Sequence, residues 1–116
     1  MAYNELLAER IAQLLDEKRV QYYSKKMFGG LCFMVDDKMC CGIVQDELMA
    51  RIGAAVYKEA LQKEHCKEMN FTGRAMKGYV FIEADGLDMD VDLDYWIQKC
   101  LDFNPLAKAS KKRKKN

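Results

Sequence analysis

The sequence predicts one α+β domain in two layers, with the order α-β(3)-α-β(2)-α and a five-stranded, mainly antiparallel sheet. Two observations lead to this prediction. Near both ends of the 116-residue chain, apolar residues recur at the spacing of an amphipathic helix. The middle of the chain instead holds short apolar runs separated by polar or glycine-containing turns, which is typical of antiparallel strands. A chain of this length fits a single domain with its own apolar core.

The first half of the chain predicts one helix followed by a three-stranded meander. Asn4 is a suitable N-cap for a helix over residues 4–19, whose leucines and isoleucine share one face. Three apolar runs follow, separated by the polar pairs Asp36-Asp37 and Gln45-Asp46. Polar pairs of this kind join antiparallel neighbours. The predicted strands cover residues 27–35, 38–44 and 48–52.

The second half predicts a helix over residues 54–63, strands near 66–71 and 76–83, and a final helix that counts Val91 and Tyr95 among its apolar residues. That helix should end near Asn104-Pro105, because proline cannot continue it. We therefore place the domain at residues 1–105. Residues 106–116 are expected to form a disordered basic tail, because they carry a run of like charge.

The hairpin of the first two predicted strands is apolar on both faces. If Asp36-Asp37 forms a two-residue turn, Cys32 lies opposite Cys41. One face then carries Cys32, Met34, Met39, Cys41 and Ile43, and the other carries Leu31, Phe33, Val35, Cys40 and Val44. A sheet with one face in water alternates apolar and polar residues. We therefore expect the second face to be covered, either within one subunit or in a homodimer.

Cysteine usage and hydropathy predict a cytoplasmic protein. The five cysteines are an odd number without C-x-x-C spacing, which favours free thiols in a reducing compartment. No stretch approaches the roughly 18–20 uncharged residues of a membrane span. The N-terminus also lacks the pattern of a signal peptide.

The charges are distributed unevenly along the chain. The last nine residues hold six of the 19 basic residues and none of the 18 acidic ones, so residues 1–107 carry a formal charge of −5. Any contact with nucleic acid should therefore come from the tail, and it should be weak and insensitive to base sequence. The candidate residues for this contact are Lys111, Lys112, Arg113, Lys114 and Lys115.

Three segments carry a specific likeness to a known family. They are KKMFGGLCF at residues 25–33, LMARIG at 48–53 and FTGRAMKGYV at 71–80, followed by Leu93 and Trp96-Ile97. In order and spacing they resemble the TfoX N-terminal domain family over about residues 2–103, as a stand-alone copy of that domain. The resemblance implies an α-β(3)-α-β(2)-α domain similar to the type III secretion chaperones.

The resemblance also implies a function. Longer members of the family regulate bacterial genes for DNA uptake and natural competence. We therefore expect a regulatory module that acts through protein–protein contacts, with a transcription factor as one kind of partner. We expect no enzymatic activity, because the sole histidine, His65, belongs to no visible nucleophile–base arrangement.

A glycine-bearing segment is a candidate phosphate-binding loop, because glycine permits close backbone approach and lysine supplies positive charge. It consists of Lys26, Met27, Phe28, Gly29 and Gly30. A phosphate-binding loop normally opens a helix, however, whereas this segment leads into a predicted strand. A bulge or close packing at the two glycines is the favoured interpretation.

Arg51, Arg74 and Lys77 are the candidates for an alternative function, the binding of a small ligand, an anion or a protein partner. They would serve this function if the fold brought them together, and a solvated strand face is the other interpretation. A separate set, Cys32, Met34, Met39 and Cys41, has the soft ligands that Cu(I) or zinc prefers. We favour core packing for these side chains and expect no metal and no other cofactor.

Overall fold

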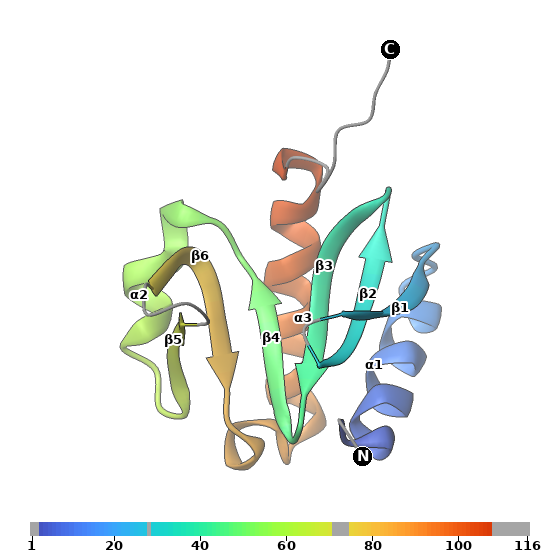
Figure 1. The fold of residues 1–116 in the computed structure, drawn as a ribbon, viewed down its shortest axis with the longest axis horizontal. Helices are drawn as coiled ribbons and strands as arrows, with labels where there is room; N and C mark the ends of the chain where they lie inside the picture. Colours follow the sequence, from blue (N-terminus) through green and yellow to red (C-terminus); the bar gives the residue numbers. More distant parts are fainter. Residues whose placement is uncertain (1–2, 28, 71–74, 108–116) are drawn as a thin grey trace.

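The computed structural model describes residues 3–27, 29–70 and 75–107 (Figure 1). Within these residues the chain forms three α-helices, six strands and three short 3₁₀ turns, labelled η. In chain order they are α1 (Glu5–Glu17), β1 (Tyr23–Met27), β2 (Gly30–Val35), β3 (Lys38–Val44), β4 (Glu47–Arg51), η1 (Ala54–Val56), α2 (Tyr57–Leu61), β5 (Cys66–Asn70), β6 (Ala75–Ile82), η2 (Ala84–Leu87), α3 (Asp90–Phe103) and η3 (Asn104–Leu106).

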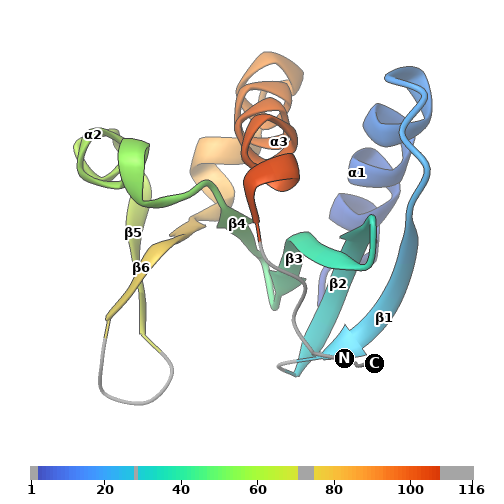
Figure 2. The same ribbon diagram turned by 90° about the horizontal axis from the view of Figure 1, so that it is seen from above.

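The strands form one sheet in the order β1-β2-β3-β4-β6-β5, and every neighbouring pair is antiparallel. The three helices lie on the same face of this sheet (Figure 2). The predicted two-layer α+β architecture is therefore confirmed. None of the helices within the described part of the chain is long and apolar enough to cross a membrane.

The described sheet has one strand more than the five predicted. The additional strand is β1, which pairs with β2 at one edge of the sheet. Its sequence, YSKKM, is mostly polar, and four of its five residues are exposed. An edge strand of this kind is held by backbone hydrogen bonds to a single neighbour, so it needs no apolar alternation. The sequence therefore contains no periodic signal for it.

Helix α1 follows from its cap and its apolar face. The side chain of Asn4 accepts a hydrogen bond from the backbone N–H of Leu7 at 3.1 Å, as the predicted N-cap should. Leu7, Ile11 and Leu15 are buried against the sheet layer, which gives the helix its position. Leu6 is 66% exposed, so its predicted place on the same face is wrong, because one residue before Leu7 it is turned about 100° around the helix. The helix ends at Glu17, two residues earlier than predicted. Arg19 has φ +62°, which is not a helical conformation, so the helix does not reach it.

The predicted helix over residues 54–63 is only a short turn of α-helix preceded by η1. Residues 84–87 form η2, which delays the start of the final helix, α3, to Asp90. This delay creates a corner between β6 and α3. Arg10 of α1 holds the corner by donating a hydrogen bond to the Leu87 carbonyl at 2.7 Å and by pairing with Asp90 at 3.1 Å.

The β2–β3 hairpin contains an irregularity that changes the predicted faces. The pairing shifts by one residue between Phe33 and Met34. Cys41 therefore lies opposite Phe33 and not opposite Cys32. A bulge sets two residues of one strand against one of the other, and the side chains beyond it exchange faces. Cys41 and Ile43 consequently belong to the core under the helices, so their predicted placement beside Cys32 is wrong.

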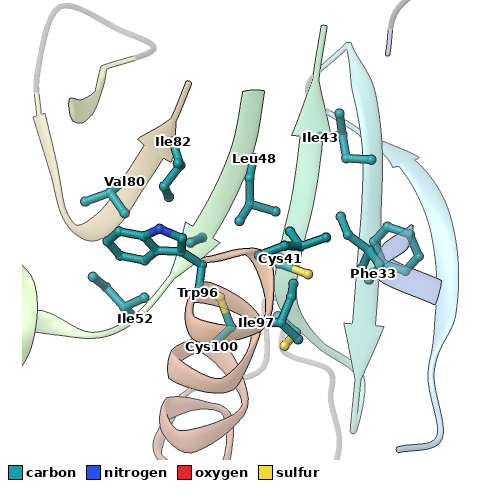
Figure 3. Close-up of a cluster of buried hydrophobic side chains, with 14 of the residues drawn as sticks. Phe33, Cys41, Ile43, Leu48, Ile52, Val80, Ile82, Trp96, Ile97 and Cys100 are labelled. Carbon is teal, nitrogen blue, oxygen red and sulfur yellow. The ribbon is translucent and has the colours of Figure 1, made fainter. Parts of the chain in front are cut away.

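The main core lies between the helices and the sheet (Figure 3). Trp96, Ile97 and Cys100 of α3 are directed toward the sheet, where Leu48 and Val80 are among the side chains they meet. All five are buried. Close packing of these side chains fixes α3 against the centre of the sheet.

The face of the sheet without helices carries a second buried cluster, which we call the methionine cluster. It consists of Cys32, Met34, Met39, Met49 and Met69. Four partly buried side chains pack against it: Met27, Met76, Tyr79 and Phe81. The second face is therefore covered within one subunit by its own long side chains, which is one of the two predicted arrangements. The homodimer stays a prediction.

Candidate functional site

The predicted glycine-bearing segment forms the connection between β1 and β2. Lys26 and Met27 end β1, and Gly30 begins β2, so a strand follows the glycines and not a helix. Gly29 has φ +74°, a conformation that side chains disfavour. A Cβ atom on Gly30 would lie 1.9 Å from the carbonyl oxygen of Ile43. These two positions therefore require glycine for a tight turn and for close packing against β3. Phe28 lies outside the described residues.

Arg51 of β4 is occupied by contacts within the chain. Its Nη1 atom donates a hydrogen bond to the Met39 carbonyl at 3.3 Å, and its guanidinium carbon lies 5.4 Å from the Tyr79 ring centroid and 5.9 Å from that of Phe103. Lys77 of β6 is exposed, and its neighbour Met76 packs on the methionine cluster. The anion-binding alternative stays a prediction.

Two further groups of predicted site residues lie outside the part of the chain that the structure describes. Arg74 lies outside the described residues, and so does the whole basic run Lys111, Lys112, Arg113, Lys114 and Lys115. The proposed nucleic-acid contact of the tail stays a prediction.

Three cysteines meet in the main core. Cys40 and Cys41 of β3 and Cys100 of α3 are all buried with free thiols. Hydrogen bonds from Cys100 and Cys41, with the nearby charge of Arg51, lower the pKa of the Cys40 thiol. The pKa of the Cys41 thiol is raised by its hydrogen bond with Cys40 and by burial. The pKa of the Cys100 thiol is raised by burial and by its own hydrogen bond with Cys40. Cys41 and Cys100 therefore stay protonated and pack as small apolar groups.

The predicted soft-ligand set is divided by the hairpin bulge. Cys32, Met34 and Met39 lie in the methionine cluster, whereas Cys41 lies in the main core. Burial raises the pKa of the Cys32 thiol to about 11, so the thiolate that a metal ion needs is disfavoured. Within the described residues, no group of three histidine, cysteine, aspartate or glutamate side chains is placed to hold a metal ion.

We therefore expect protein purified without chelators or an affinity tag to contain far less than one equivalent of zinc or copper. Inductively coupled plasma mass spectrometry of the dialysed protein measures this content. A Cys32→Ala variant is the control, because it removes the thiol of the methionine cluster without touching the main core. Near-stoichiometric copper that this variant loses would contradict core packing as the role of these side chains.

A hollow lies at the corner between β6 and α3. It has a volume of about 580 Å³. Three segments line it: the turn between α2 and β5, the 3₁₀ turn η2, and the first two turns of α3. The lining residues are Lys63, Glu64, His65, Asp85, Gly86, Val91, Asp92, Tyr95 and Trp96. We call this hollow the α3 basin.

The turn that carries His65 is held in an unusual conformation. His65 has φ +69°, which is uncommon for a residue with a side chain. Its carbonyl accepts a hydrogen bond from the backbone N–H of Glu83 at 2.8 Å. A Cβ atom on Gly86 would lie 2.7 Å from the Cβ of His65, so the absence of a side chain there lets the turn rest on η2. Strained conformations of this kind persist where neighbouring structure enforces them.

The floor of the α3 basin is aromatic. Trp96 is buried, and the ring of Tyr95 meets it edge-on, with the centroids 5.1 Å apart and the planes at 83°. The ammonium nitrogen of Lys63 lies 4.8 Å from the Tyr95 centroid, and that of Lys99 lies 5.4 Å from it. Tyr95 is therefore an exposed ring that already attracts cations.

The rim of the α3 basin is mainly acidic. Glu64, Asp85 and Asp92 line it, against Lys63 and His65 on the basic side. Asp92 lies in the first turn of α3, where the helix dipole favours a negative charge. The Nδ1 atom of His65 lies 3.7 Å from Oε1 of Glu83, just outside the basin. The surface therefore combines aromatic area with excess negative charge.

The sequence did not predict this site. Val91 and Tyr95 were counted among the apolar residues that define the final helix, yet their side chains are 69% and 36% exposed. The buried face of α3 consists of Leu93, Trp96, Ile97 and Cys100. Val91 and Tyr95 are four positions apart and lie together beside that face. Placing the apolar residues on a helical wheel would have separated the two groups.

Comparisons with known proteins give one match. No curated protein and no solved structure matches the chain. A family model, the TfoX N-terminal domain, matches residues 13–104, which is most of the chain. The matched region runs from within α1 to the end of α3, so it includes the whole sheet and the residues of the α3 basin. The chain therefore belongs to the TfoX N-terminal domain family.

Proposed function

We propose that this chain is a non-enzymatic regulatory module that acts through protein–protein contacts in the control of genes for DNA uptake. Membership of the TfoX N-terminal domain family supports the regulatory role. The α3 basin supports protein contact as the means, because the exposed side chains of Val91 and Tyr95 line it.

The single observation that carries this proposal is the exposure of large apolar residues at the start of α3. Met89, just before α3, is 62% exposed, and Val91 in its first turn is 69% exposed. Tyr95 lies one turn after Val91 and lines the same hollow. Single exposed apolar residues are common, but several beside an aromatic hollow are typical of interaction surfaces. Tyrosine and tryptophan are also the residue types that most often supply binding energy there.

The lining of the α3 basin favours binding over chemistry. Among the described residues that line it there is one histidine and no serine, threonine or cysteine. Among these described residues, His65 therefore has no serine or threonine hydroxyl and no thiol to activate as a nucleophile. We propose on this ground that the basin recognises a partner without altering it covalently.

Site-specific photo-crosslinking in cells tests the contact. We expect a benzophenone side chain at Val91 to form a discrete adduct with another protein, which mass spectrometry identifies. The same group at Gln13, an exposed position of α1, should form no such adduct. Loss of the gene should also reduce natural transformation. Equal labelling from Val91 and Gln13, or unchanged transformation, would refute the proposal, and an adduct formed only from Lys77 would favour the alternative surface on β6.

A further inference from the structure

We propose that the α3 basin binds a basic linear segment of a partner protein, in which lysine or arginine lies next to an apolar side chain. This inference rests on the proposed function and adds the chemistry of the partner. It follows from three features of the basin: carboxylates without an ion-pair partner among the described residues, an aromatic ring that attracts cations, and exposed apolar side chains.

The carboxylates of the rim are available to a partner. Glu64, Asp85 and Asp92 have no ion pair and no side-chain hydrogen bond with any other residue that the structure describes. Other acidic residues nearby are already paired within the chain: Asp90 with Arg10 and Asp94 with Lys18. The three rim carboxylates therefore supply the negative potential that attracts a cationic segment.

The ring of Tyr95 shows where a partner cation would lie. The Lys63 ammonium lies 4.8 Å from its centroid, on an exposed turn and without a carboxylate partner in the described part of the chain. A lysine or arginine of the partner can take this position beside Asp92 and displace Lys63 into water. Arginine is especially suited, because its planar group stacks on a ring and binds a carboxylate at the same time.

The apolar part of the partner has a matching surface. Val91 is directed away from the core and borders the basin, and Trp96 contributes to its floor. The volume of about 580 Å³ falls in the range of sites that enclose small ligands or a few side chains. An acidic segment or a nucleic acid is a poor occupant, because the rim carboxylates would repel its charges.

Peptide binding to the full-length protein tests this inference. The probe is a fluorescein-labelled hexapeptide, Lys-Leu-Lys-Lys-Leu-Lys, followed by fluorescence anisotropy. Its comparison is the same peptide with glutamate in place of lysine. We expect the basic peptide to bind more than tenfold more tightly than the acidic one. Its affinity should fall as added salt screens the charges. In ¹⁵N-labelled protein, the largest chemical-shift changes should fall on residues 63–65, 85–86 and 91–96.

Two matched triple variants separate the basin from general acidity. Glu64→Gln, Asp85→Asn and Asp92→Asn remove three charges from the basin. The control triple, Glu5→Gln, Glu9→Gln and Glu17→Gln, removes three negative charges from α1. The two triples are matched, because each removes one charge from the first turn of a helix: Asp92 in α3 and Glu5 in α1. We expect about tenfold weaker binding for the basin triple and less than a twofold change for the α1 triple. Circular dichroism melting verifies that both variants remain folded.

A Tyr95→Ala variant tests the aromatic floor without changing any charge. We expect this variant to bind the basic peptide about tenfold more weakly, as truncation of a tyrosine at a binding surface commonly does. Equal weakening by the two triple variants, tighter binding of the acidic peptide, or shift changes confined to other elements would overturn the inference.

The inference and the proposed function can fail separately. A crosslinked partner at Val91 together with failure of the basic peptide would leave the regulatory contact in place and refute its basic chemistry. Binding of the basic peptide in the basin with no adduct at Val91 in cells would refute the proposed function instead. A further peptide, with the sequence of residues 108–116, has the charge but lacks large apolar side chains. If it bound as tightly as the hexapeptide, the apolar part of the inference would be wrong.

Discussion

A Leu48→Ala variant should lose about 2–5 kcal/mol of the free energy of unfolding. Leu48 lies in β4 at the centre of the sheet with 0% of its surface exposed, in the same core cluster as the buried residues of α3 (Figure 3). Truncation removes apolar contacts and leaves a cavity that the neighbouring strands β3 and β6 cannot fill. Urea unfolding followed by circular dichroism measures the change.

Leu6→Ala is the matched control for this variant. Leu6 lies on α1 with 66% of its surface exposed, so its truncation should change the free energy of unfolding by less than about 0.5 kcal/mol. Alanine also favours the helix slightly. A loss for Leu6→Ala as large as that for Leu48→Ala would mean that the assignment of inner and outer faces is incorrect.

Raising the pH from about 9 to about 11 should destabilise the protein markedly. Burial raises the pKa of the Cys32 thiol from its usual value of 9.0 to about 11, so the folded chain holds this proton more tightly than the unfolded chain. The corresponding stability is fully present below pH 9 and is lost as the pH rises toward 11. For Cys32 alone the loss is about 2–3 kcal/mol.

Other groups titrate in the same direction over this range. Burial raises the pKa of Cys66 to about 11, and burial likewise raises the pKa of the Tyr57 hydroxyl. A Cys32→Ala variant separates the contribution of Cys32 from theirs, because the other groups remain. In urea unfolding at pH 8.5 and 10.5, the variant should lose less stability than the parent chain. Identical pH dependence of the two proteins would show that Cys32 does not ionise differently in the folded state.

The elements with strong local signals could be predicted from the sequence. The side chain of Asn4 caps α1, and the apolar periodicity of α1 includes its buried residues Leu7, Ile11 and Leu15, with the exposed Leu6 as the exception. The Asp36-Asp37 turn is also confirmed, since both residues have positive φ values, 55° and 62°, as a tight hairpin turn of this type requires. In each case the preference resides in a few consecutive residues.

Features that depend on pairing between strands could not be predicted in the same way. Strand β1 has a polar sequence and owes its existence to the free edge of β2. The bulge beside Phe33 shifts the register by one residue, and nothing in the local sequence distinguishes this register from the regular one. Because successive strand residues alternate between faces, this single shift moved Cys41 from one buried cluster to the other.

The sequence by itself determined the α+β class, the Asn4 cap, the Asp36-Asp37 turn, the segregation of charge and the family, because each is encoded in local patterns or in the order of short motifs. The tertiary structure alone decided where surfaces form. Tyr95 and Lys63 are distant in sequence and meet only because α3 packs beside the turn after α2. Whether an apolar residue is core or surface depends on what packs against it. That is why Leu93 and Val91, on one helix, have opposite surroundings.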